Sequence, residues 1–152
     1  MTLDKRLSED YIAAYKAKNA AVLSVLRLLK TAITNRQVEL RKPGAPLPDE
    51  EIISLIIRQA KQRKDSIEQF RAAGRADLAE KEAQELAILE QYLPSQLTPE
   101  ELDAAISQAI SETGVTDPRE MGKVVGAIMA RYQGRVDGKA VAAGVREKLQ
   151  AS

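Results

Sequence analysis

The strongest constraint on the fold is one charged stretch in the middle of the chain, interrupted by a glycine and closed by a proline. It runs from Lys61 to Thr98 and reads KQRKDSIEQFRAAGRADLAEKEAQELAILEQYLPSQLT. Gly74 favours a turn because glycine reaches positive φ without a Cβ clash. Pro94 ends the second helical segment because it has no N–H to donate and disfavours helix in the residue before it. The stretch therefore predicts a helical hairpin followed directly by a domain boundary.

Apolar residues recur at helical spacing before this hairpin. The pattern predicts a first helix from about Leu3 to Ala17 and a second that is capped by Asn19. The second carries the widest apolar stripe and is expected to be the central helix of a bundle. A loop rich in proline at 42–48 follows, and the carboxylates of 49–51 favour the start of a third helix.

Three shorter helices are predicted after the hairpin. Residues 98–101, Thr-Pro-Glu-Glu, combine an N-cap, a proline at the first helical position and a capping-box glutamate. Gly114 ends that helix, Asp117 starts the next with the same kind of signal, and Gly134 stops it. Asp137 is expected to cap the last helix.

These signals predict an all-α protein: an N-terminal bundle of about four helices at 1–94, and a small three-helix domain at 95–152. Hydrophobic residues at 44% can build such cores, and charged residues at 30% suit a helical chain. The segment from Pro94 to Thr98 is expected to be an exposed connector between the two domains.

Composition also limits the chemistry that we expect. The chain has no cysteine, which excludes disulfides and thiolate metal sites, and no histidine, the usual general base. No nucleophile–base pair, phosphate-binding loop or metalloprotease motif is found, so no catalytic residue, metal or cofactor is expected. No apolar run is long enough for a membrane span, and the expected location is cytoplasmic.

Charged residues interrupt the apolar stripes of the hairpin helices at similar distances from Gly74. Arg63 and Lys64 break the stripe of the third helix, and Glu82 breaks that of the fourth. We expect the two cations to lie opposite Glu82 or Glu85 and to form ion pairs between the helices. The alternative is that the long basic side chains reach solvent and pair with nothing.

Gly122 and Gly126 stand four residues apart in the helix predicted after Asp117. Each glycine costs about 1 kcal/mol relative to alanine in a helix interior, so something must offset that cost. The simpler interpretation is the close approach of a neighbouring helix. The alternative is a bare backbone strip that admits a ligand or an RNA backbone.

Five cations surround this part of the chain: Arg119, Lys123, Arg131, Arg135 and Lys139. The last two flank Asp137, where free backbone N–H groups at a helix start favour an anion. Together they form a candidate phosphate-binding surface. The alternative is a solvated surface with ordinary ion pairs, which suits a chain whose formal net charge is only +1.

The segments MGKVVGAIM and GRVDGK, together with AGRADLAEKEAQELAILEQYLP, resemble the GatB/YqeY family, and similarity to its free-standing YqeY-like members covers nearly the full chain. In GatB, the B subunit of the tRNA-dependent amidotransferase, similar segments form a helical region and a tail that engages tRNA. The positions that match the tail motif are Gly122, Lys123, Gly126, Gly134, Arg135, Asp137, Gly138 and Lys139.

The resemblance implies an accessory protein that associates with tRNA or another structured RNA. The family carries a label of carbon–nitrogen ligase activity with glutamine as amido-N-donor, but this chain resembles neither the kinase-like domain nor the amidase that the reaction needs. Fold-level analogy does not transfer an activity. The alternatives are a protein–protein adaptor that docks on another subunit and, ranked below it, a contribution to an amide-forming complex.

Overall fold

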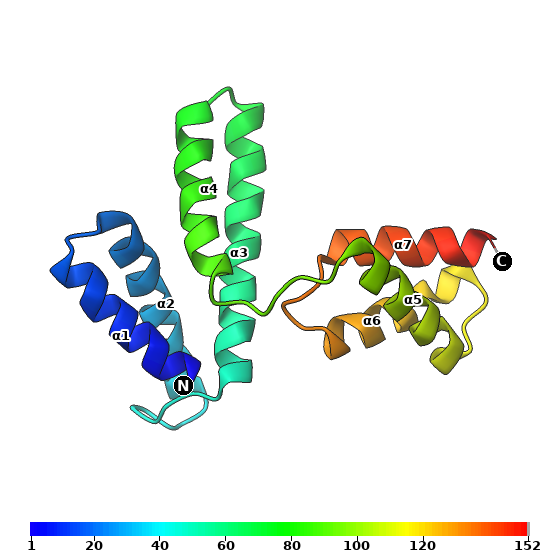
Figure 1. Cartoon of the computed structure of the whole chain (residues 1–152), viewed down its shortest axis with the longest axis horizontal. Coiled ribbons are helices and arrows are strands. Elements are labelled where there is room, and N and C mark those ends of the chain that lie inside the picture. Colours follow the sequence, from blue (N-terminus) through cyan, green and yellow to red (C-terminus); the bar gives the residue numbers. More distant parts are fainter. Residues whose placement is uncertain (152) are drawn as a thin grey trace. The chain divides into compact units, whose positions relative to one another are not determined.

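A computed structural model of the chain describes residues 1–151 and confirms the all-α fold class, with no strand in that range (Figure 1). The helices are α1 (Leu3–Lys16), α2 (Ala20–Glu39), α3 (Asp49–Ala72), α4 (Ala76–Glu90), α5 (Pro99–Thr113), the short 3₁₀ helix η1 (Pro118–Glu120), α6 (Met121–Arg131) and α7 (Gly138–Ala151). The chain forms two compact units, Met1–Leu93 and Pro94–Ser152.

In the first unit, α2 packs against α1, α3 and α4. One face of α2, with Val25, Leu26, Leu29 and Ile33, is buried. The helices α3 and α4 contribute to the same core only with the halves that lie away from the Gly74 turn. The buried residues of this core include Val25, Leu26, Leu29, Ile52, Ile56 and Leu89. The wide apolar stripe of α2 thus has a physical reason, because the helix has neighbours on several sides.

The helices α3 and α4 lie side by side as an antiparallel pair (Figure 1). Gly74, in the turn between them, has a φ of 72°, in the left-handed region that glycine enters without strain. The predicted hairpin is therefore present, and the turn is made by the residue that the sequence indicated.

Helix starts follow the predicted capping chemistry in two places. The Asn19 side chain accepts a hydrogen bond from the Val22 N–H at 3.2 Å. Thr98 and Glu101 form a reciprocal capping box, with both N–H···O distances at 3.1 Å. Such caps satisfy N–H groups that the helix itself leaves unpaired.

In the second unit, α5, α6 and α7 surround a core of branched aliphatic side chains, which includes Ile106, Val124, Ile128, Val141, Val145 and Leu149. The Asp117 signal gives a different result from the one predicted. Its side chain accepts from the Arg119 N–H at 2.9 Å and so starts the 3₁₀ turn η1, whereas α6 begins at Met121 without a side-chain cap.

The segment before α5 is tied to the loop between α6 and α7. Leu97 N–H donates to the Arg135 carbonyl at 2.8 Å, the Gln96 amide to the Gly134 carbonyl at 2.8 Å, and the Arg135 guanidinium to the Ser95 carbonyl at 2.9 Å. Ser95, Gln96 and Thr98 are exposed, as expected of a connector. The hydrogen bonds that tie the segment into the second unit were not indicated by the sequence.

None of the helices described here combines the length and the apolar character that crossing a membrane would need.

Candidate nucleic-acid interface

The outer face of α6 is a strip of small residues bordered by two cations. Gly122, Gly126 and Ala130 recur at intervals of four and are all exposed. Lys123 and Arg131 are also exposed and lie beside this row, and α6 contains no carboxylate. The opposite face of the helix supplies Val124 and Ile128 to the core, so the strip faces solvent because the helix is amphipathic.

No neighbouring helix explains the two glycines. A Cβ at Gly122 or Gly126 would meet no other atom within 4 Å. The interpretation that they admit a packed helix within this unit is therefore wrong, and the reason is that both point away from the core. The glycine that does serve packing is Gly144 in α7, where a Cβ would lie 2.7 Å from the Ile106 Cδ1 atom.

The five predicted cations differ in their availability. Arg119 forms an ion pair with Asp117 at 2.8 Å, which raises the pKa of Arg119 and lowers that of Asp117 through the hydrogen bonds between them. The Arg135 side chain binds the Ser95 carbonyl and holds the segment before α5. Both guanidinium groups thus have local structural roles that the sequence did not indicate.

The other three cations lie on exposed positions. Lys139 is in the first turn of α7. Arg131 makes an ion pair with Glu112, whose carboxylate lies 3.6 Å from its Nη1 atom. Lys123 forms no ion pair with any residue in 1–151. The structure therefore brings Lys123 and Arg131 together on one helix, whereas Arg119, Arg135 and Lys139 belong to the segments on either side of it.

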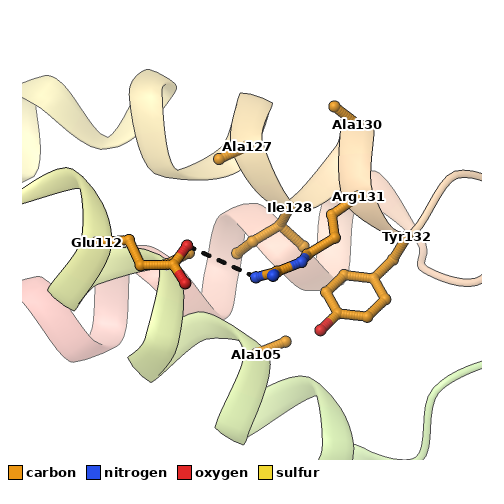
Figure 2. Close-up of a pocket in the computed structure, with 8 residues that line it drawn as sticks. Ala105, Glu112, Ala127, Ile128, Ala130, Arg131 and Tyr132 are labelled. Carbon is orange, nitrogen blue, oxygen red and sulfur yellow. Dashed lines mark ion pairs between the residues drawn. The ribbon is translucent and has the colours of Figure 1, made fainter.

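A hollow of about 370 Å³ opens between α5 and α6 beside this strip. Figure 2 shows Glu112 and Arg131 facing each other across it, with the ring of Tyr132 next to Arg131 and its hydroxyl directed toward Ala105. The remaining lining residues are small or aliphatic: Ala109, Ala127, Ile128 and Ala130. The hollow thus combines an apolar floor, one aromatic ring and one exposed ion pair.

A separate cluster of charges lies within the α3–α4 hairpin. Arg63 Nη1 lies 3.2 Å from Glu82 Oε2 and also contacts the carboxylate of Glu85. Arg63 and Glu85 are both buried. Lys64 takes no part: it is exposed and has no ion pair in the described chain, because the next residue of a helix points about 100° away from Arg63.

Comparisons with known proteins place the chain in a family. The model of the family described as "Yqey-like protein" matches residues 4–149. A relative from Pyrenophora tritici-repentis, named "Altered inheritance of mitochondria protein 41, mitochondrial", is 33% identical over 153 residues, which cover 96% of this chain and 80% of the relative. A relative of the same name from Lachancea thermotolerans is 32% identical over 115 residues, or 74% of this chain and 60% of the relative.

The names of these relatives contradict the cytoplasmic location expected from the sequence, because they describe mitochondrial proteins. The expectation rested on the lack of an apolar run. That pattern argues against secretory signals and membrane spans, but it does not distinguish the cytoplasm from other aqueous compartments, and mitochondrial leaders are amphipathic instead of apolar.

Two residues of the hollow were missed by the sequence analysis as site candidates. Tyr132 has the spacing of a core residue, and one part of its side chain does pack on the core of the second unit. Glu112 stands in the last turn of α5 and has no distinguishing neighbour in the sequence. Only the packing of α5 beside α6 brings these two side chains to one place, and no local pattern encodes it.

Proposed function

Because this chain belongs to the Yqey-like protein family, and the family's resemblance to the GatB tail suggests RNA as a ligand, we propose that its second unit binds structured RNA, with tRNA as the first candidate. The chain acts in this role as an accessory binding protein and catalyses no step by itself. The observation that carries the proposal is the open glycine strip of α6, with Lys123 and Arg131 along one side of it. Gly126 in the interior of α6 lowers stability, and no packing within the unit offsets that cost; Gly122, in the first turn, is equally open.

A bare helix backbone with flanking cations suits a phosphate chain. The absence of Cβ atoms at Gly122 and Gly126 lets a bulky polyanion approach closely, and Lys123 and Arg131 supply the charge. Phosphate contacts position an RNA without reading its sequence. Binding is therefore expected to be tolerant of base changes and sensitive to salt.

The whole unit is not basic, which makes the position of the charges decisive. Residues 94–152 contain seven Lys or Arg and eight Asp or Glu. A diffuse electrostatic attraction is thus not expected, and affinity must come from the α6 face. The residues of α6 include cations and no carboxylate, and the one carboxylate paired with them within residues 1–151 is Glu112 of α5.

The test is tRNA binding by the full chain, measured by fluorescence anisotropy at several salt concentrations. The names of the relatives make mitochondrial tRNAs the first probes. Lys123→Ala and Arg131→Ala should each weaken binding and flatten the log–log salt slope by about 0.7 to 0.9. Arg146→Ala removes an exposed cation of α7 and is the matched control, which should change binding much less.

Gly126→Leu tests the strip itself. It should weaken RNA binding by filling open surface. Helical circular dichroism should be kept and the melting temperature should not fall, because a Cβ at this position meets nothing within 4 Å and leucine favours helix more than glycine does. If the wild-type chain shows no salt-dependent association with tRNA even at low ionic strength, the proposal is wrong.

A protein partner is the second candidate, and a different surface favours it. Ile12 and Tyr15 stand one turn apart on α1 and are 54% and 65% exposed, and Leu28 on α2 is 54% exposed. Exposed apolar side chains in one unit favour an adaptor role for that unit. Co-purification with and without RNase distinguishes the two candidates, because an RNA-mediated complex is lost on digestion and a direct protein complex is kept.

A further inference from the structure

We propose that the hollow between α5 and α6 takes one unpaired nucleobase of the bound RNA, and that Glu112 makes guanine the preferred base. This inference rests on the proposed RNA-binding function and adds a base-specific contact to it. It is derived from three properties of the hollow: its size and floor, its aromatic side wall, and its weakly held ion pair (Figure 2).

The floor suits a flat ring. Ala105 and Ala109 of α5 are almost fully buried and present only methyl groups, and Ala127 of α6 lines the other side. At about 370 Å³ the hollow lies near the small end of ligand sites, which range over about 300–1,000 Å³. A single ring system therefore fits it better than an extended ligand.

Tyr132 provides the surface on which a base can stack. Its side chain is half-buried and packs on the core of the second unit, so the ring is held in position before any ligand arrives. Its hydroxyl forms no hydrogen bond with residues 1–151 and remains able to donate to the ligand. Proteins commonly stack unpaired RNA bases on tyrosine rings and on arginine planes, and Arg131 lies next to this ring in Figure 2.

The Glu112–Arg131 ion pair can open at little cost. The two side chains are 56% and 53% exposed and their charged atoms are 3.6 Å apart, so the pair is well solvated. Once it opens, Arg131 can bind a phosphate while Glu112 accepts hydrogen bonds from a base. An ionised carboxylate only accepts, so it selects bases by the N–H groups on their edges.

Guanine is the base with two adjacent donors, N1–H and the N2 amino group, which match the two carboxylate oxygens. Adenine and cytosine place an acceptor beside their amino group, and uracil places its single N–H between two carbonyls. Hypoxanthine, the base of inosine, keeps the N1–H of guanine and lacks only the amino group. The preference expected from Glu112 is therefore guanine over hypoxanthine, and hypoxanthine over uracil.

The strip and the hollow are continuous along α6. Ala127 and Arg131 follow Lys123 by one and two helical turns on neighbouring positions of the same face. An RNA backbone that lies over Gly122 and Gly126 can thus place the next base in the hollow.

The experiment compares hairpin RNAs that share one stem and differ at one loop position, which carries guanosine, inosine or uridine. Binding to the full wild-type chain is measured by anisotropy. We expect the guanosine loop to bind about tenfold more tightly than the uridine loop, a difference of the size known for one good base-edge contact. Inosine should give an intermediate affinity.

Glu112→Gln removes a negative charge and so is expected to raise affinity for every RNA. The informative quantity is the ratio of the guanosine to the inosine affinity, which should fall toward one. Glu120→Gln, at an exposed carboxylate of the same unit, is the matched control and should keep the wild-type ratio.

Tyr132→Phe should keep the guanosine affinity within a few-fold by retaining the ring, and Tyr132→Ala should lower it about tenfold by removing the stack. Because Tyr132→Ala also removes core contacts, Ala127→Leu provides a second variant: it fills the hollow from an exposed position and should abolish the loop preference. Circular dichroism verifies that both variants fold.

Equal affinity of the wild-type chain for all three loops overturns the base-site inference, even when salt-dependent tRNA binding is intact. A guanosine preference that survives Glu112→Gln and Ala127→Leu also overturns it. Failure to bind any RNA overturns the proposed function together with this inference.

Discussion

Removal of Arg63 should be among the most destabilising single changes in the first unit. The side chains of Arg63 and Glu85 are each only 9% exposed, and Arg63 Nη1 serves both Glu85 and Glu82. Arg63→Ala leaves two carboxylates beside each other, one of them buried and without a counter-charge. Breaking a buried pair in this way costs about 3–5 kcal/mol, and we expect Arg63→Ala to fall in that range.

The three members of the cluster should differ in a set order. Glu85→Ala leaves Arg63 with a remaining partner, Glu82, and should cost less than Arg63→Ala. The Glu82 side chain is 24% exposed and lies 3.2 Å from the guanidinium, so Glu82→Ala should cost least, about 1 kcal/mol.

The hydrogen bonding of the cluster is incomplete. The Nε–H of Arg63 and the Oε1 of Gln59 are both buried and have no hydrogen-bond partner in the described chain. The double replacement Arg63→Met/Glu85→Leu removes the two buried charges together. We expect it to remain within about 1 kcal/mol of the wild type, or to exceed it, because apolar side chains of similar volume avoid the desolvation cost.

The assay is urea unfolding of the full chain and of each variant, followed by circular dichroism, with hydrogen exchange of α3 and α4 peptides to locate the effect. Lys64→Ala is the matched control, since Lys64 is the neighbouring cation and is exposed; its effect should stay within about 0.5 kcal/mol. A coupling energy below about 0.3 kcal/mol between Arg63→Ala and Glu85→Ala in a double-mutant cycle would refute the reasoning.

Three further predictions follow from other parts of the structure. Gly126→Ala should raise stability by up to about 1 kcal/mol because its position is open, whereas Gly144→Ala should lower it because the new Cβ meets a buried side chain; paired thermal melts measure both. A fragment of residues 94–152 should keep helical circular dichroism, because its core and its first hydrogen bonds are internal, and a random-coil spectrum would refute this. Hydrogen bonds from Arg36 lower the pKa of Glu51, so this pair stabilises the folded state above the usual glutamate pKa and stops doing so as the pH falls through the lowered value. The Arg36→Gln variant should therefore lose less stability on acidification than the wild type. Urea titrations at stepped pH measure this difference.

Local signals explain why the helix boundaries could be predicted from the sequence. The capping box at Thr98 and the left-handed turn at Gly74 depend on a few consecutive residues, so their chemistry is visible in the chain itself. Asp117 shows the limit of that reasoning. Its side chain caps the turn that follows, as the sequence indicated, but the 3₁₀ helix η1 comes next in place of an α-helix.

The glycines show what a single sequence does not contain. Gly126 and Gly144 both stand inside helices, and their local sequences do not reveal which one meets a neighbour. The packing of α7 against α5 places Ile106 at Gly144, and no element of the described chain covers Gly126. For the same reason the hollow was not predicted, because Glu112 and Tyr132 become neighbours only when α5 and α6 pack.

The structure limits the number of charges that the strip itself supplies. Arg119 is paired with Asp117, Arg135 is bound to a backbone carbonyl, and Lys139 belongs to α7. The charges of the strip are therefore Lys123 and Arg131, and Arg131 must first leave Glu112. Two phosphate contacts give a log–log salt slope of about −1.4 for single strands and −1.8 for duplex RNA treated as B-DNA. A slope of that size implies modest affinity at physiological salt. A chain that binds one RNA selectively must therefore obtain the rest of its binding free energy from contacts that salt does not weaken. The uncharged part of the hollow, with Tyr132 and its alanine floor, offers such contacts beside α6.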